Sequence, residues 1–121
     1  MEDKIDLAEM IQAIKMDPDF SKVGMIASHL GVVRETSLSG RRVKEIDVSF
    51  DKDAINMIVR DTKKMPGIVE VLVRTCGGRL KIGDDIMGVV VGGDTRDHVF
   101  PALISTVERI KKNGGTKREL F

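Results

Sequence analysis

The chain has 121 residues, 41% of them hydrophobic, so it is long enough to bury a core, and we expect residues 1–121 to form a single domain. Its 20 basic and 19 acidic residues give a formal net charge of +1, which argues against a nucleic-acid-binding or membrane-surface protein. The aromatic residues are four Phe, without Trp or Tyr, so the stacking platforms of single-strand nucleic-acid binders are missing. Any anion-binding site must therefore be a local cluster of basic side chains.

The sequence also bears on compartment, metals and cofactors. Cys76 is the single cysteine and cannot form an internal disulfide, and no charged-then-apolar leader begins the chain, so we expect a cytoplasmic protein. The longest apolar run, residues 86–93, is too short to span a membrane. No His, Cys or carboxylate pair has the spacing of metal ligands, so we expect neither a bound metal nor a cofactor.

The first half of the chain predicts a helix followed by two strands. Asp6 and Glu9 have the spacing of a capping box and start a short amphipathic helix. Residues 22–33 are too continuously apolar for a surface helix and indicate a buried strand. A turn at Gly40 leads to the alternating residues 43–50, so we predict a pair of strands joined by an exposed basic loop.

The second half predicts a helix, two strands and a last helix. Asp51 or Asp53 caps a helix that ends by Gly67, and strands follow at residues 68–74 and 86–91 with a glycine turn between them. This order predicts an α+β fold with helices packed on a mixed or antiparallel sheet. The apolar residues of the last helix fall on one stripe that we expect to be buried: Phe100, Leu103, Ile104, Val107 and Ile110.

Residues 92–95, Gly-Gly-Asp-Thr, join the last predicted strand to the last helix. Free backbone N–H groups and the positive end of the helix dipole would suit a phosphate there, beside Arg96. His98, in the first turn of the helix, could also approach an anion. The alternative is an ordinary turn in which Asp94 or Thr95 caps the helix.

Basic residues also follow the first predicted strand. Arg34 comes directly after a core strand, where its planar guanidinium would match a phosphate or a carboxylate. Arg41 and Arg42 fit a solvated hairpin tip better. Within the same strand, His29 is expected to be a core or edge histidine whose hydrogen bonds are satisfied.

The final segment places Lys111 before a Gly114-Gly115 break and Lys117 after it. One interpretation is a frayed basic tail whose cations compensate the helix dipole. The other is chemical, since neighbouring cations disfavour the protonated form of a lysine and free its amine for nucleophilic or proton-transfer work. Arg96 and Lys111 lie fifteen residues apart, roughly 22 Å along one helix. Both can therefore serve one site only if that site is long or is built across a dimer.

Four segments stand in order between residues 23 and 119: VGMIASHLGVVRE, GRRV, GRLKIGDDIMGVVVGGDTRDHVF and ERIKKNGGTKRE. Their combination resembles the catalytic, larger subunit of molybdopterin synthase. The resemblance implies an α/β hammerhead-type fold and a cytoplasmic sulfurtransferase of molybdenum-cofactor biosynthesis. It also implies a homodimer within a heterotetramer, with a small ubiquitin-like sulfur-carrier subunit at each end. The carrier's C-terminal Gly-Gly tail bears a thiocarboxylate, and sulfur passes from it to cyclic pyranopterin monophosphate to form the dithiolene of molybdopterin.

The resemblance further implies a set of site residues. Lys111 is expected to transfer protons or handle the carrier tail covalently, and Lys117 to anchor the substrate and stabilise charge. We expect Arg96 of one protomer to serve Lys111 of the other. The substrate-binding positions that the resemblance assigns are Val32, Val33, Arg34, Thr95, Arg96, Lys111, Lys117, Arg118 and Glu119.

Two departures from the family pattern motivate alternatives. Thr95 stands where the family usually has His, and the segment between Lys111 and Lys117 is shorter and lacks an aromatic residue. A non-catalytic or divergent paralogue that binds a ubiquitin-like sulfur carrier as a scaffold would tolerate both changes. An unrelated phosphate-binding regulatory module would explain the glycine loop, but not the two separated lysines.

Overall fold

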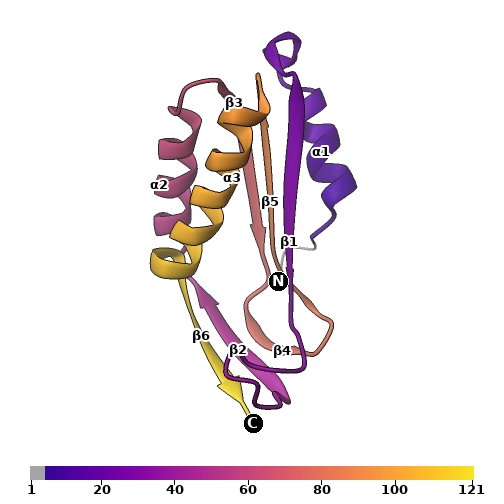
Figure 1. Cartoon of the computed structure of the whole chain (residues 1–121), viewed down its shortest axis with the longest axis vertical. Coiled ribbons are helices and arrows are strands. Elements are labelled where there is room, and N and C mark those ends of the chain that lie inside the picture. The colour runs from indigo at the N-terminus through magenta and orange to yellow at the C-terminus, as the bar shows by residue number, and fades with distance from the viewer. Residues whose placement is uncertain (1–4) are drawn as a thin grey trace.

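The computed structural model describes residues 5–121, which fold into helices packed on two antiparallel sheets (Figure 1). This arrangement confirms the predicted α+β class, with sheets that are antiparallel throughout the described strands. The predicted extent of the domain, residues 1–121, includes residues 1–4, which lie outside the described part. The elements in chain order are α1 (Leu7–Lys15), a 3₁₀ turn (Phe20–Lys22), β1 (Met25–Val32), β2 (Glu45–Phe50), α2 (Lys52–Lys63), β3 (Ile68–Thr75), β4 (Gly78–Lys81), β5 (Asp85–Gly93), α3 (Arg96–Arg109), a π-helical turn (Ile110–Gly114) and β6 (Gly115–Leu120).

The larger sheet has the strand order β1-β5-β3 and is covered by helices on both faces. Figure 1 shows α2 and α3 side by side on one face and α1 on the other. The central strand β5 serves both layers, because Val89 and Val91 join the cluster under α2 and α3 while Val90 joins the cluster under α1. All three valines are 0% exposed. Alternation along a strand thus gives β5 two buried faces.

The smaller sheet has the order β4-β2-β6 and lies beyond the ends of α2 and α3, toward the C-terminus (Figure 1). Its central strand buries Ile46 and Val48 against Val33, which comes directly after β1. Phe50 and Ile86 pack against this cluster and also against the main core. The two sheets therefore share a continuous apolar contact at their junction.

The first predicted strand is shorter and more exposed than the sequence suggests. β1 lies at an edge of the larger sheet and is half-buried, because it has a neighbouring strand, β5, on one side only. The predicted pairing of residues 22–33 with residues 43–50 is wrong, since β2 pairs with β4 and β6 in the other sheet. The turn itself is confirmed, with Gly40 at φ +87° and its N–H donated to Ser37 O at 2.9 Å. Apolar patterns identify strands, but they do not identify the neighbours of each strand.

Two strands were not predicted, and both are edge strands of the smaller sheet. β4 occupies part of the expected turn region, and β6 occupies the expected tail. Their polar residues lack a strand-like apolar alternation, but ion pairs connect both to β2: Arg79 lies 3.9 Å from Glu45, and Arg118 lies 3.5 Å from Asp47. Charged edge strands of this kind also resist unwanted pairing with other chains.

The predicted helix caps are confirmed, but the buried face of α3 differs from the prediction. Asp6 accepts the Glu9 N–H at 3.2 Å, and Asp51 accepts the Ala54 N–H at 3.1 Å. On α3, the predicted core residues Phe100 and Ile104 are 49% and 57% exposed. The side chains of α3 and the following turn that are buried are Val99, Ala102, Leu103, Thr106 and Ile110. The stripe is displaced because a polar residue, Thr106, takes a core position.

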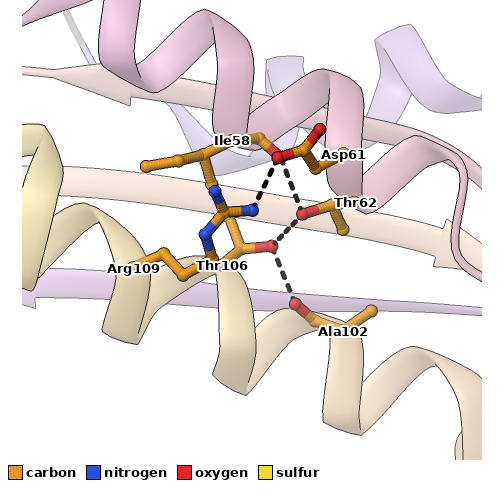
Figure 2. A network of polar contacts seen from close by, with 6 residues as sticks. All are labelled: Ile58, Asp61, Thr62, Ala102, Thr106 and Arg109. Atoms are coloured by element: carbon orange, nitrogen blue, oxygen red, sulfur yellow. Dashed lines mark hydrogen bonds and ion pairs between the residues drawn. The ribbon is translucent and has the colours of Figure 1, made fainter.

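Thr106 can be buried because its hydroxyl group has polar partners, among them the hydroxyl of Thr62 on α2. Their hydroxyl oxygens are 3.0 Å apart, Thr62 also donates to Ile58 O at 2.9 Å, and Thr106 to Ala102 O at 2.7 Å (Figure 2). Two hydroxyl protons can serve only two of these three contacts at once. The more exposed ion pair of Arg109 with Asp61, at 3.0 Å, flanks the threonines and also links α2 to α3.

We predict that Thr62→Val and Thr106→Val each lower the free energy of unfolding by about 1 kcal/mol, because each removes one member of a buried hydroxyl pair. The double variant should lose less than the sum of the two, since both changes remove the same contact. Urea unfolding of the four proteins measures this coupling. Arg109→Ala is the surface control and should cost less, about 0–1 kcal/mol. Strictly additive losses for the two threonines would contradict this description of the network.

Candidate functional site

The predicted site residues fall at the two ends of α3 rather than in one place. Arg96 is the first residue of α3, whereas Lys111 lies in the π-helical turn beyond its last residue. A helix of 14 residues separates such positions by roughly 20 Å. Arg34 and Lys117 belong to the same end as Lys111, because both lie at the junction of the two sheets. Within a single chain, three of the four predicted cations thus lie toward the same end of the molecule, and Arg96 lies at the other.

Arg34 is held at the junction through the residue before it. Val33 is 3% exposed and packs against Val48 of the smaller sheet. Its N–H donates to Asp84 O at 2.9 Å, and its carbonyl accepts the Gly83 N–H at 2.8 Å. The backbone just before the exposed Arg34 is therefore fixed, while the guanidinium stays available to solvent and ligands. Val32, another predicted contact, is 44% exposed where β1 departs from regular pairing with β5.

Lys117 lies on the face of the smaller sheet that packs toward Val33. In β6, Lys117 is directly opposite Val48, and Glu119 is directly opposite Ile46. Directly opposed residues of antiparallel strands share a face, so both side chains lie on the side of the buried β2 residues. Arg118 alternates to the other face, where it meets Asp47. The structure therefore brings Lys117 and Glu119 to the junction and gives Arg118 a partner elsewhere.

The two glycines between the lysines are packed, and the segment is not a frayed tail. Gly114 is buried, and its carbonyl accepts the Asp51 N–H at 2.8 Å. A Cβ at Gly115 would lie 2.7 Å from Ser49 O and 2.9 Å from the Phe50 ring. Gly115 itself is extended, with φ −177°, so it is required for close approach and not for an unusual backbone. The expected movable break is thus a tight connection that positions Lys117 relative to Lys111.

His29 of β1 is within the electrostatic reach of Lys111. Burial lowers the pKa of His29 below its ordinary value, and the nearby ammonium of Lys111 lowers the pKa further. The Nε2 atom of His29 is buried and has no hydrogen-bond partner among the described residues. The expectation of a satisfied histidine is therefore wrong. The sequence offered one indication that His29 faces the core. In a strand, alternate side chains share a face, so His29 lies on the same face as Met25 and Ala27, which pack against the main core.

The glycine loop before α3 already holds a negative charge of its own. Asp94 Oδ1 accepts the Thr95 N–H at 2.6 Å and lies 2.7 Å from His98 Nδ1. The hydrogen bond with His98, followed in importance by the Thr95 N–H, holds the pKa of Asp94 below its usual value despite opposing desolvation. Within the described chain, Thr95 makes no capping bond through its side chain. The helix end expected to bind phosphate thus carries a carboxylate beside the exposed Arg96.

Gly67 allows Asp94 and His98 to sit so close together. It has φ +78°, a left-handed conformation that favours glycine, and a Cβ there would overlap the Asp94 carboxylate and the His98 ring. Its carbonyl accepts the Asp94 N–H at 2.9 Å. The end of α2, the start of β3 and the start of α3 are thereby fixed together around Arg96.

No group of three or more His, Cys, Asp or Glu side chains in residues 5–121 could hold a metal ion. Within the same range, none of the helices combines the length and apolar character needed to cross a bilayer. That the protein holds neither metal nor cofactor stays a prediction.

The chain matches the family model described as MoaE protein over residues 1–113. The chain belongs to the MoaE protein family. This match confirms the family resemblance and covers the quoted segments up to residue 113, so Lys117, Arg118 and Glu119 lie beyond it. No curated protein matches the chain significantly.

Solved structures of this family share the MoaE fold of the chain. Molybdopterin synthase from Staphylococcus aureus has a TM-score of 0.79 at 20% identity, covering 100% of this chain and 88% of that one. Molybdopterin cofactor biosynthesis protein E from Burkholderia multivorans has a TM-score of 0.78 at 21% identity, covering 99% and 80%. A complex of subunits 1 and 2 of molybdopterin-converting factor from Helicobacter pylori gives 0.72 at 15% identity, covering 98% and 81%.

We predict that Gly115→Ala lowers the melting temperature and displaces β6, because the new methyl group would press on Ser49 O and the Phe50 ring. Displacing β6 also moves Lys117, so activity should fall in the protein that remains folded. Thr116→Ala, at the exposed neighbouring position, is the matched control and should change neither property. Thermal unfolding and amide exchange of β6 measure the effect. An alanine variant with wild-type protection of β6 would contradict the close packing of this glycine.

Proposed function

We propose that this MoaE-family chain is the catalytic subunit of a molybdopterin synthase. It transfers sulfur from a thiocarboxylated ubiquitin-like carrier subunit to cyclic pyranopterin monophosphate and so forms the dithiolene of molybdopterin, in the cytoplasm. Family membership over residues 1–113 and the shared fold support this function. The observation that carries it is that the segments bearing Arg34, Lys111 and Lys117 all lie at the end of the chain where the two sheets meet.

The chemistry of the two reactants fits this cluster. A cyclic phosphate and a thiocarboxylate are both anions, and charge-assisted hydrogen bonds from guanidinium and ammonium groups bind such anions strongly. Arg34 offers a planar fork for the phosphate, next to the fixed backbone of Val33. Lys117 anchors the substrate and stabilises charge that develops during transfer, and Lys111 handles the carrier tail and moves protons. Glu119 shares the Lys117 face and limits the net positive charge there.

Arg118 forms an ion pair with Asp47 on the face of β6 opposite Lys117. It would have to leave Asp47 and the opposite face of β6 to reach a substrate bound beside Lys117. The exposed ion pair with Asp47 is weak enough to permit this, at about 0–1 kcal/mol. Its assignment as a substrate contact therefore implies a change of partner on binding.

A second protomer completes the site. Because Arg96 lies at the far end of α3, it reaches the substrate only if it comes from a partner chain in a homodimer. Phe100 and Ile104 follow Arg96 at intervals of four residues, so the three share one face of α3, and both apolar side chains are about half exposed. Contact between copies through this face would carry Arg96, with Thr95 beside it, toward the neighbouring Lys111. With one carrier per protomer the assembly is a heterotetramer.

A scaffold that binds the carrier without catalysis is the second candidate. It is favoured by the N-terminus of α3, where Thr95 supplies no imidazole and His98 is engaged with Asp94. In such a protein the cluster around Lys111 would bind the carrier tail but yield no dithiolene.

We predict that Lys111→Ala lowers dithiolene formation at least about 100-fold, the scale expected for loss of a group that acts on the reacting centre. Purified protein, thiocarboxylated carrier and cyclic pyranopterin monophosphate make the assay. Lys112→Ala, which removes the adjacent exposed lysine, is the matched control and should retain activity. Carrier binding without product in the wild-type protein would instead favour the scaffold.

The shared site has its own test in mixed dimers. Arg96→Ala and Lys111→Ala proteins should each be nearly inactive, and a heterodimer of the two should regain activity because one of its sites keeps both side chains. Product formation after mixing and exchange of subunits measures this. Absence of any recovery in verified heterodimers would show that Arg96 and Lys111 act within the same chain or not together.

A further inference from the structure

His29 has no role in the reaction proposed above, although it is within the electrostatic reach of Lys111. It lies on β1 three residues before Val32 and faces the layer formed by α3 and the π-helical turn. Its cross-strand partner on β5 is Val89. The hydrophobic cluster on this side of the sheet includes side chains of β5, α3 and the π-helical turn: Met87, Val89, Val91, Val99, Ala102, Leu103 and Ile110. Thr106 of α3 is buried there as well. Lys111 is the charged side chain that acts on the imidazole.

The Nε2 atom of this imidazole makes no hydrogen bond within the described chain. Nε2 is buried and has no partner among residues 5–121, and such atoms are rare in folded proteins because an unpaired buried polar group is costly. Gly31, two residues further along the same face, has no side chain, and a Cβ there would lie 3.5 Å from Nε2. A methyl group there would touch Nε2, so glycine leaves the ring free of a side chain at this position, and we infer that the ligand uncovers the buried Nε2 from this side.

We propose that His29 is a positioning residue, whose Nε2–H donates a hydrogen bond to the carboxylate-like end of the carrier tail while Lys111 neutralises its charge. The inference rests on the proposed function, because the tail is the anion that this function brings to Lys111. Beside the charged side chains of the proposed site, a neutral imidazole gives the hydrogen bond a direction without adding a further cation. A partner that arrives with the ligand also accounts for the unpaired Nε2 of the protein alone.

The proposal predicts how the affinity for the carrier depends on pH. In the protein alone, burial and the ammonium of Lys111 lower the pKa of His29, so the ring is neutral at pH 7. A bound anion offsets Lys111 and favours the imidazolium, which raises the pKa of His29 in the complex. By linkage, the carrier must then bind more tightly as the pH falls through the region between these two pKa values. A purely structural histidine would produce no such dependence.

Three variants separate the roles of shape and hydrogen bonding. His29→Phe keeps a ring without the Nε2 donor, and His29→Gln restores an N–H donor but cannot titrate. Ser28→Ala is the matched control, because Ser28 is exposed on the opposite face of β1. Since His29→Phe removes an unpaired buried nitrogen, we expect it to melt at or above the wild-type temperature. If the melting temperature of His29→Phe is below that of wild type, carrier binding is compared between wild type and His29→Gln instead.

The experiment is calorimetric titration with the carrier in its unmodified Gly-Gly carboxylate form between pH 5.5 and 8. We expect wild type and Ser28→Ala to gain affinity as the pH falls. His29→Phe should bind roughly tenfold more weakly and lose that gain, as for a hydrogen bond to a charged group. His29→Gln should recover part of the affinity without the pH dependence.

Nitrogen NMR of His29 supplies an independent readout. We expect its pKa in the protein alone to rise in Lys111→Ala, and in wild type to rise on carrier binding, with Nε2 protonated in the complex. Unchanged affinity and pH dependence in His29→Phe, or an Nε2 that accepts a bond from Lys111, would overturn the inference alone. A wild-type protein that does not bind the carrier would overturn the proposed function as well.

Discussion

The burial of β5 on both faces is the constraint on which the rest of the structure depends. Val90 contacts the layer of α1, whereas Val89 and Val91 contact the layer of α2 and α3, and none of the three is exposed. Because α3 must lie along this strand, its two ends are held roughly 20 Å apart. The separation of Arg96 from Lys111 follows from the length of this helix, so a site that uses both must be long or, as we propose, draw on a second protomer.

The second determinant is the contact between the two sheets. Val33 packs on Val48 of β2, which fixes the backbone before Arg34, and β6 places Lys117 on the same face of the smaller sheet. The π-helical turn and its packed glycines set the distance between Lys111 and this strand. Apolar packing and backbone pairing therefore set the positions of the segments that carry Arg34, Lys111 and Lys117.

The sequence predicted the elements whose signals are local. Asp6 and Asp51 cap helices as expected, and the apolar run of β5 is a buried strand. The strands β4 and β6 could not be predicted, because their charged residues become strands only through pairing with β2. Likewise, Thr106 is a core residue only because Thr62 meets it from another helix. The family pattern predicted the cations of the proposed site, whereas the unpaired Nε2 of His29 could not be predicted because it depends on the burial of that atom in the fold.

The central claim is that the carrier tail ends at the junction of the two sheets, beside Lys111. The most direct measurement uses a carrier whose C-terminal glycine is an activated thioester, which acylates the nearest free amine, and peptide mass spectrometry to locate the modified lysine. The geometry predicts modification at Lys111, with Lys117 as the second site. Acylation spread over distant lysines such as Lys22 and Lys64, which lie toward the N-terminal end of α3, with Lys111 untouched, would contradict it.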